Sequence, residues 1–328
     1  MRALALAALL SLSLAACAPH HFHTPSAPDE RAIRIDARAL PLNPADPKQD
    51  RVGAFVFAGA LQLASPDTAL FGGLSDLKVS DDGVLTAVSD EGSLLRAHIV
   101  LDDAGRLVGL DRGRIALLTG QDGRPLPNKN EADAEGLAVW PNGELMVSFE
   151  HDHRIWIYPA GGGQPRPAPR PGGRMPKNSG MEALALAPAE GADAYWVGVE
   201  AGQIWLCRRS GGCQPAHGQF PAPLGYRLPA LFEMANGDLV IEHHHWDPVG
   251  GTHVIISVIG NPATKAGPAL KARLRLDPPL TIDNIEGVAV VDRAGGAHRL
   301  YLISDDNFAR TQKTLLMAFD FKGEGGAQ

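Results

Sequence analysis

The sequence predicts an all-β protein, a single β-propeller of about five to six four-stranded blades. A pattern of two short alternating strands around a turn occurs five times, and successive copies lie about 50 residues apart. That spacing matches propeller blades and is too long for leucine-rich or hexapeptide solenoids. The chain has 37 Gly and 26 Pro among 328 residues, which suits a protein with many turns.

Each copy begins at an acid, except the fourth, and its second strand ends at an acid. The copies span residues 76–90, 135–150, 182–200, 230–242 and 286–305. Residues that pair in a hairpin are equidistant from its turn, and every midpoint falls at or beside a Gly. Gly tolerates the positive φ that tight turns need. We therefore expect the first and last residues of each copy to lie side by side.

The number of blades depends on the N-terminal strands. Segments near 33–42 and 52–63 alternate like strands. They could complete the last blade and close the ring, or they could form a degenerate sixth blade. The Pro-rich segment 165–176 is predicted to be a surface loop between blades.

The N-terminus predicts export and lipid anchoring. Residues 1–16 read as a lipoprotein signal peptide, because a dozen apolar residues follow Arg2 and end in Ala15-Ala16-Cys17. Cys17 would carry the lipid, residues 17–30 would form a flexible tether, and 31–328 the propeller. Ala18 favours the periplasmic face of the outer membrane. The alternative is an ordinary cleaved signal.

Two cysteines remain, Cys207 and Cys213, on either side of a predicted tight turn. An exported protein can keep a disulfide, and a pair across a hairpin meets its distance limits. Metal binding by two lone thiols is the alternative.

Composition and motifs exclude several functions. The net charge is −7, so no basic surface for nucleic acid is expected. The chain lacks the Gly-x-Ser-x-Gly elbow, the P-loop and the dinucleotide fingerprint.

Acids at the first strands predict a metal site. If these strands are innermost, Asp76, Glu135, Glu182 and Glu286 converge on the central channel. Converging carboxylates repel one another unless a cation, shared protons or water intervene. Calcium is the expected cation because it takes six to eight oxygen ligands, and Asn284 is a further donor. Zinc is less favoured because these strands hold no His or Cys cluster.

The closing acids predict a second ring on the same face, formed by Asp90, Glu150, Glu200, Glu242 and Asp305. Asp76, Glu150 or Asp305 would orient or deprotonate a water molecule. The alternative is that these acids only fix turns and cap neighbouring blades.

The fourth copy departs from the pattern. It lacks the opening acid, Arg227 precedes it, and His243-His244-His245 follow Glu242. Arg227 could bind an anionic group or neutralise the ring. Glu242 and His243 are further candidates for substrate contact. A solvated loop is the alternative for the histidines, and Glu150-His151-Asp152-His153 carries the same ambiguity.

Several strings resemble the bacterial phytase-like family, described as esterase-like proteins of the phytase group. They are FGGLSDL at 71–77, VSDEG at 88–92, DAEGLA at 133–138, SFE at 148–150, DNIEG at 283–287 and SDDNF at 304–308. The resemblance implies a propeller and hydrolysis of phosphate or other esters. His243-His244-His245 depart from it, because the family pattern suggests Arg soon after Glu242.

The sequence thus predicts an envelope-anchored, calcium-dependent ester or phosphoester hydrolase acting on a small molecule. The alternative is a non-catalytic propeller lipoprotein that binds a ligand or a protein partner.

Overall fold

The computed structural model describes residues 30–322, except 178, 218, 219, 221, 222, 261, 265 and 266. The predicted signal peptide and Cys17 lie outside the described residues. Within them, no helix is long and apolar enough to cross a membrane.

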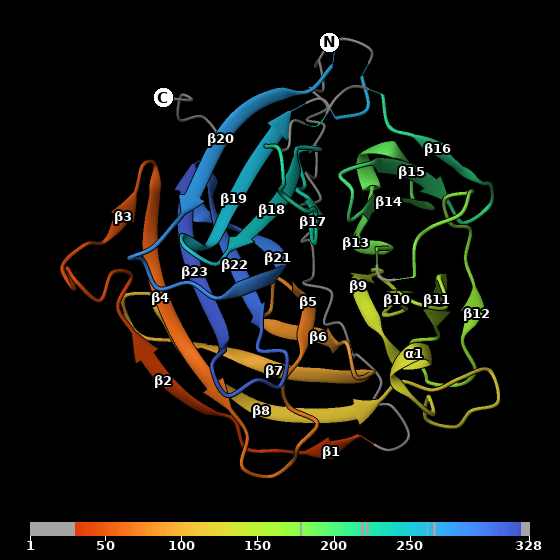
Figure 1. The fold of residues 1–328 in the computed structure, drawn as a ribbon, viewed down its shortest axis with the longest axis horizontal. Coiled ribbons are helices and arrows are strands. Elements are labelled where there is room, and N and C mark those ends of the chain that lie inside the picture. The colour runs from red at the N-terminus through yellow and green to blue at the C-terminus, as the bar shows by residue number, and fades with distance from the viewer. Residues whose placement is uncertain are drawn as a thin grey trace, which may run out of the picture.

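Five blades form a β-propeller ring, with β5, β9, β13, β17 and β21 innermost and in contact with their neighbours (Figure 1). From the centre outward, the first blade consists of β5 (Leu74–Val79), β6 (Val84–Ser89), β7 (Ser93–Leu101), β8 (Leu107–Leu117) and β1 (Arg31–Ala32). The second consists of β9 (Ala134–Val139), β10 (Leu145–Phe149), β11 (Arg154–Tyr158) and β12 (Arg166–Pro167). The third consists of β13 (Met181–Leu186), β14 (Ala194–Val199), β15 (Ile204–Arg208) and β16 (Cys213–Pro215). The last two are β17 (Leu231–Glu233), β18 (Leu239–Asp247), β19 (Gly251–Gly260) and β20 (Ala269–Leu276); and β21 (Asn284–Arg293), β22 (Ala297–Asp305), β23 (Thr314–Lys322), β4 (Phe55–Ala64) and β2 (Asp36–Leu40), with β3 (Arg51–Val52) beside β4. Helix α1 (Lys129–Ala132) and the 3-10 turns Pro188–Glu190 and Ala294–Gly296 complete the elements.

The N-terminal strands close the ring. Strand β4 pairs with β23, with Leu61 opposite Leu316, and β2 pairs with β4. The first and last parts of the chain thus share the fifth blade, and no sixth blade forms among the described residues. Because the two chain ends hold each other, the ring opens only if this sheet separates.

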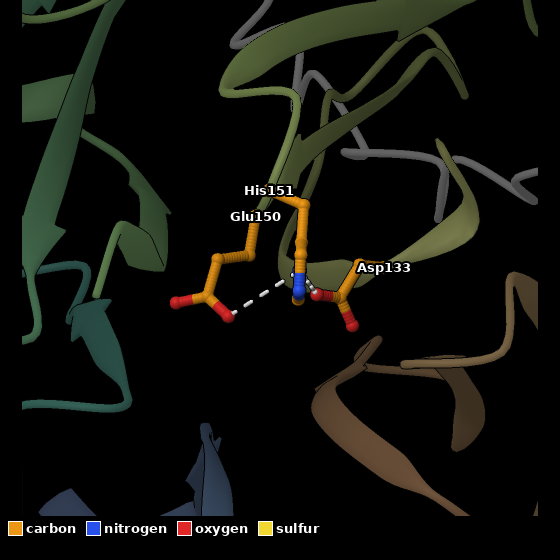
Figure 2. A group of neighbouring side chains, drawn as sticks. All are labelled: Asp133, Glu150 and His151. Carbon is orange, nitrogen blue, oxygen red and sulfur yellow. Dashed lines mark hydrogen bonds and ion pairs between the residues drawn. The ribbon is translucent and has the colours of Figure 1, made fainter. Parts of the chain in front are cut away.

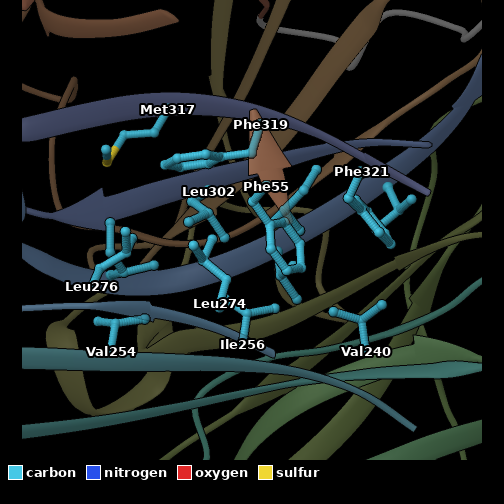
Figure 3. Packing of buried hydrophobic residues seen from close by; sticks show 14 of the residues in the cluster. Phe55, Val240, Val254, Ile256, Leu274, Leu276, Leu302, Met317, Phe319 and Phe321 are labelled. Carbon is cyan, nitrogen blue, oxygen red and sulfur yellow. The ribbon is translucent and has the colours of Figure 1, made fainter. Parts of the chain in front are cut away.

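Apolar side chains pack between the faces of neighbouring blades. Figure 3 shows one such cluster, in which Leu274 and Ile256 of the fourth blade lie near Leu302 and Phe319 of the fifth. All four are at most 1% exposed. The alternation of apolar residues along each strand supplies this packing, and burial of apolar surface stabilises the ring.

The predicted Cys207–Cys213 disulfide is present and joins β15 to β16, with the Cα atoms 4.0 Å apart.

The hairpin register differs from the prediction in four blades. The pairing shifts by one residue at the start of the innermost strand, where β5, β9, β13 and β21 each carry a β-bulge. Asp76 therefore lies opposite Val88 and not Asp90, and Asn284, not Glu286, lies opposite Asp305. A bulge adds one unpaired residue, which counting outward from the turn does not detect. In the fourth blade Leu231 pairs with Ile241 as expected, and the one-residue shift lies before β17, between the Arg227–His244 bridge and the pairing of Ala230 with Glu242.

Glycine follows the bulge in two blades because the innermost strands approach closely. A Cβ on Gly136 would lie 2.6 Å from the carbonyl oxygen of Glu182 in the next blade. One on Gly287 would lie 2.8 Å from the Cα of Asp76. Backbone atoms cannot yield as a flexible side chain does, so the Glu-Gly pairs of the sequence mark contacts between blades.

We expect Gly136→Ala to lower the free energy of unfolding by about 1–3 kcal/mol, because the methyl group overlaps the neighbouring strand. Urea unfolding followed by tryptophan fluorescence measures the change. The matched control is Gly109→Ala in β8, where the nearest atom to the new Cβ is 3.7 Å away. Equal stability of the two variants would contradict the close approach.

Candidate functional site

A cavity of about 580 Å³ opens where the bulged ends of the innermost strands meet. Seven carboxylate side chains line it: Asp90, Asp133, Glu135, Glu150, Glu182, Glu286 and Asp305. Its lining also holds the cations Lys129 and Arg227 and the imidazoles of His151, His244 and His245. The cavity is therefore strongly acidic.

The bulges place three glutamates at equivalent positions in the cavity lining. The added residue is Glu182 in β13 and Glu286 in β21, and in β9 Glu135 and Gly136 together face the single residue Ser148. The corresponding residue of the first blade is Ser75. In the fourth blade it is Pro229, since Arg227 pairs with His244 as Asp133 pairs with Glu150. The sequence predicted the convergence of these three glutamates.

Asp76 does not join this ring, which corrects the expectation that it orients water there. It lies one residue beyond the bulge, is 0% exposed and forms an ion pair with Lys78 at 2.7 Å. It also accepts a hydrogen bond from the backbone N–H of Leu137 at 2.8 Å. Burial raises the pKa of Asp76 to about 6, although Lys78 opposes the shift. Its visible role is to join the first blade to the second.

The three glutamates have little neutralising charge nearby. Among the described residues, Glu135 and Glu182 form no ion pair and accept no hydrogen bond. Glu286 accepts one from Asn284 Nδ2 at 2.7 Å, and His244 Nδ1 lies 3.8 Å from its carboxylate. Burial raises the pKa of Glu135, and the neighbouring charges of Asp133, Glu182 and Glu286 raise it further. The pKa of Glu286 is raised by burial and then by Glu182.

These residues fit a hard cation. Carboxylate oxygens from Glu135, Glu182 and Glu286, with the amide oxygen of Asn284, make an oxygen-only donor set of the kind calcium takes. A cation would remove the repulsion that raises the pKa values of the three glutamates.

Four of the closing acids surround the three glutamates, and each of these four has a partner. Lys129 Nζ lies 2.5 Å from Asp90, and Arg227 pairs with Glu200. The backbone N–H of Gly180 donates to Glu150 at 3.1 Å, and that of Asn307 donates to Asp305 at 2.6 Å. Burial raises the pKa of Glu150 to about 7 and the pKa of Asp305 to about 7, and in each case neighbouring acids add to the shift.

In the fourth blade His244, not Glu242, takes the closing position. Glu242 pairs with Ala230, is 0% exposed, and neither of its carboxylate oxygens has a hydrogen-bond partner among the described residues. Burial raises its pKa, and its charged neighbours include Asp76, Lys78 and Glu286. It lies outside the cavity lining because it stands two residues before the closing position, as Ser148 stands two residues before Glu150 in the second blade.

His243 is also outside the cavity lining, which corrects the expectation that it contacts substrate. Its side chain alternates with that of His244 and is 1% exposed. Burial lowers its pKa to about 4.

His244 lines the cavity, and its Nδ1–H donates to the carbonyl of Ile285 at 3.1 Å. Arg227 lies at the cavity with 65% of its side chain exposed, so it is accessible to an anionic group.

A second group at the cavity combines Asp133, Glu150 and His151 (Figure 2). One donor atom from each lies within 4.8 Å of the other two. Sequence reasoning did not select Asp133, and it left His151 unassigned. The available signal was that Asp133 lies two residues before Glu135 and His151 directly follows Glu150, so the two paired strand ends bring them together.

The serines beside the acids are all hydrogen-bonded within the fold. Ser148 Oγ accepts from the N–H of Gly136, Ser89 Oγ pairs with Ser93 Oγ, and Ser304 Oγ donates to the carbonyl of Lys313. None of the three lines the cavity. The site is therefore built from acids, cations and imidazoles rather than around a serine nucleophile.

Comparison with known proteins gives a family and a set of solved structures. No curated protein matches the chain in sequence. The major allergen Mala s 1 of Malassezia sympodialis is 14% identical, with 90% of this chain and 97% of that chain covered and a TM-score of 0.47. Virginiamycin B lyase from Staphylococcus aureus is 14% identical, with 88% and 89% covered and a TM-score of 0.39. These likenesses carry no functional conclusion.

The family model is more specific than these structures. It is the phytase-like model, described as esterase-like activity of phytase, and it matches residues 69–308. The match includes every residue of the acidic cavity, from Asp90 to Asn307. The chain belongs to the phytase-like family of β-propellers.

Proposed function

We propose that the protein is a calcium-dependent hydrolase of small esters or phosphoesters. The observation that carries the proposal is the convergence of Glu135, Glu182 and Glu286 on one cavity, with no ion pair to Glu135 or Glu182 among the described residues. Buried carboxylates that repel one another weaken a fold, so their presence in one cavity favours a role in binding or chemistry. The description of the family supports the reaction class.

In this proposal Glu135, Glu182, Glu286 and Asn284 hold the ion. Bound calcium would polarise the ester or phosphoryl oxygen. Glu150 and Asp305 orient the attacking water at the rim. Arg227, and His244 beside it, face the anionic part of the substrate. Water is the expected nucleophile because the serines near the acids are held in hydrogen bonds.

We expect the full chain to bind calcium, with a melting temperature that rises with calcium concentration. At a concentration 100 times the Kd, binding adds about 2.7 kcal/mol to the free energy of unfolding. Glu182→Gln should weaken binding at least tenfold by calorimetry. The control is Glu190→Gln, which changes an acid outside the cavity that forms no ion pair among the described residues. Unchanged calcium affinity in Glu182→Gln would refute this metal site.

We expect calcium-stimulated turnover in a screen of phosphomonoester, phytate, lactone and carboxyl-ester substrates, with kcat lowered at least 100-fold in Glu286→Gln.

Arg227→Ala should raise KM for anionic substrates and leave KM for neutral esters unchanged, because only an anion needs the guanidinium. A protein that binds calcium and hydrolyses none of these substrates would instead be the non-catalytic, ligand-binding propeller.

We further propose that Cys17 anchors the protein at the periplasmic face of the outer membrane. The support is the sequence Leu14-Ala15-Ala16-Cys17 after a short apolar run. The protein should incorporate labelled palmitate and fractionate with outer membranes, and Cys17→Ser should lose the label. Release of the unaltered protein as a soluble, unlabelled form would exclude the anchor.

A further inference from the structure

The rim of the cavity holds an imidazole whose position the calcium proposal does not explain. His151 follows β10, and its side chain is 24% exposed and lines the cavity. Its backbone has a φ of 53°, a conformation that residues with a Cβ seldom adopt, and its N–H donates to the carbonyl of Lys177 at 3.2 Å. This turn brings the ring between Glu150 and Asp133 (Figure 2).

The carboxylate of Asp133 contacts Lys129 through one oxygen and His151 through the other. Only 2% of its side chain is exposed, and Lys129 Nζ lies 2.7 Å from Oδ1. Lys129 also pairs with Asp90 at 2.5 Å, so it joins the first blade to the second at the cavity. Although burial opposes it, hydrogen bonding to Asp133 and Asp90 raises the pKa of Lys129, so this cation stays charged. The remaining oxygen, Oδ2, is the one that faces His151 Nδ1.

This contact selects one tautomer of the neutral imidazole. A carboxylate only accepts hydrogen bonds, so Nδ1 carries a proton, and in the neutral ring Nε2 carries the lone pair. Among the described residues no partner hydrogen-bonds to His151 Nε2. Glu150 lies on the other side of the His151 ring. One of its carboxylate oxygens accepts a hydrogen bond from Gly180 N–H, and the other lies 3.8 Å from His151 Nδ1.

The same contacts argue against a metal at this group. Both oxygens of Asp133 have partners, Lys129 and His151, and the nitrogen close to the two carboxylates is the protonated one. A metal ligand would need the lone pair of that nitrogen. The three residues thus form a fixed carboxylate–imidazole pair with a second carboxyl group beside it.

We propose that His151 is the general base of the hydrolysis, with Asp133 and Lys129 as its positioning residues. The inference rests on the proposed function. Nε2 takes a proton from a water molecule as the water oxygen bonds to the acyl carbon or the phosphorus. The ester C–O or P–O bond then breaks, and the imidazolium returns the proton to the departing oxygen. Asp133 stabilises the charged ring between the two transfers.

The tautomer is tested by proton–nitrogen correlation NMR of the full chain labelled with ¹⁵N-histidine, with the His151 signals assigned from their loss in His151→Gln. At neutral pH we expect a protonated Nδ1 and an unprotonated Nε2. In Asp133→Asn the amide can donate to Nδ1, so the proton should move to Nε2. A protonated Nε2 in the unaltered protein would overturn the assignment. Loss of the Nδ1–H signal on adding zinc would also overturn it, since His151 would then be a metal ligand.

The kinetic test uses the substrates that the unaltered protein hydrolyses. His151→Gln should lower kcat about 100-fold or more with little change in KM, and calcium affinity should be retained. The matched control is His153→Gln, whose imidazole contacts the carbonyl of Pro176 and does not line the cavity. Equal kcat in His151→Gln and the unaltered protein would refute the base. Absence of turnover in every protein would refute the hydrolase, and the tautomer would then decide whether His151 is a poised base.

Discussion

The β-bulge at the start of the innermost strands is the feature on which the acidic site depends. In a regular hairpin the pairing would continue to the strand ends, and the opening glutamates would follow the alternation of their strands. The bulge adds one residue and re-aims its side chain, and in the second, third and fifth blades that residue is Glu135, Glu182 or Glu286. Three separate hairpins thereby deliver the same group to one cavity. Gly136 and Gly287 follow the bulge because a neighbouring strand lies within contact distance.

The fold must offset the repulsion that this arrangement creates. Seven carboxylates line the cavity against two permanent cations, and burial raises the pKa of several of them. Packing between blades and closure of the ring through β4 and β23 supply the opposing free energy. Because the repulsion lowers the stability of the fold, the three glutamates favour a binding or catalytic role over the alternative that they only fix turns.

The propeller has repeated blades, but its site is asymmetric. Ser75 and Pro229 replace the glutamate in two blades, and His244 replaces the closing acid in the fourth. Arg227 lies beside His244, and the pair formed by Asp133 and His151 lies at the second blade. A cation, an anionic group and a base can thus be held at different sectors of one cavity. Repetition gives the scaffold, and departures from repetition give chemically distinct positions.

Much of this could be predicted from the sequence, because hairpins are local. Alternation of apolar residues, Gly at the turns and the spacing of the copies indicate the five hairpins, and the family strings around Glu135 and Glu286 agree with them. The choice between five and six blades stayed open until the structure showed β4 paired with β23. Glu135, Glu182 and Glu286 were found in this way. Tertiary structure decided what depends on one residue of register or on contacts between blades. The bulge moved Asp76 out of the ring and into an ion pair with Lys78, and in the fourth blade the pairing of Arg227 with His244 put His244 in the place expected for Glu242. Contacts among Lys129, Asp133 and His151 depend on where two paired strand ends and a short helix meet, which no periodicity along the chain encodes.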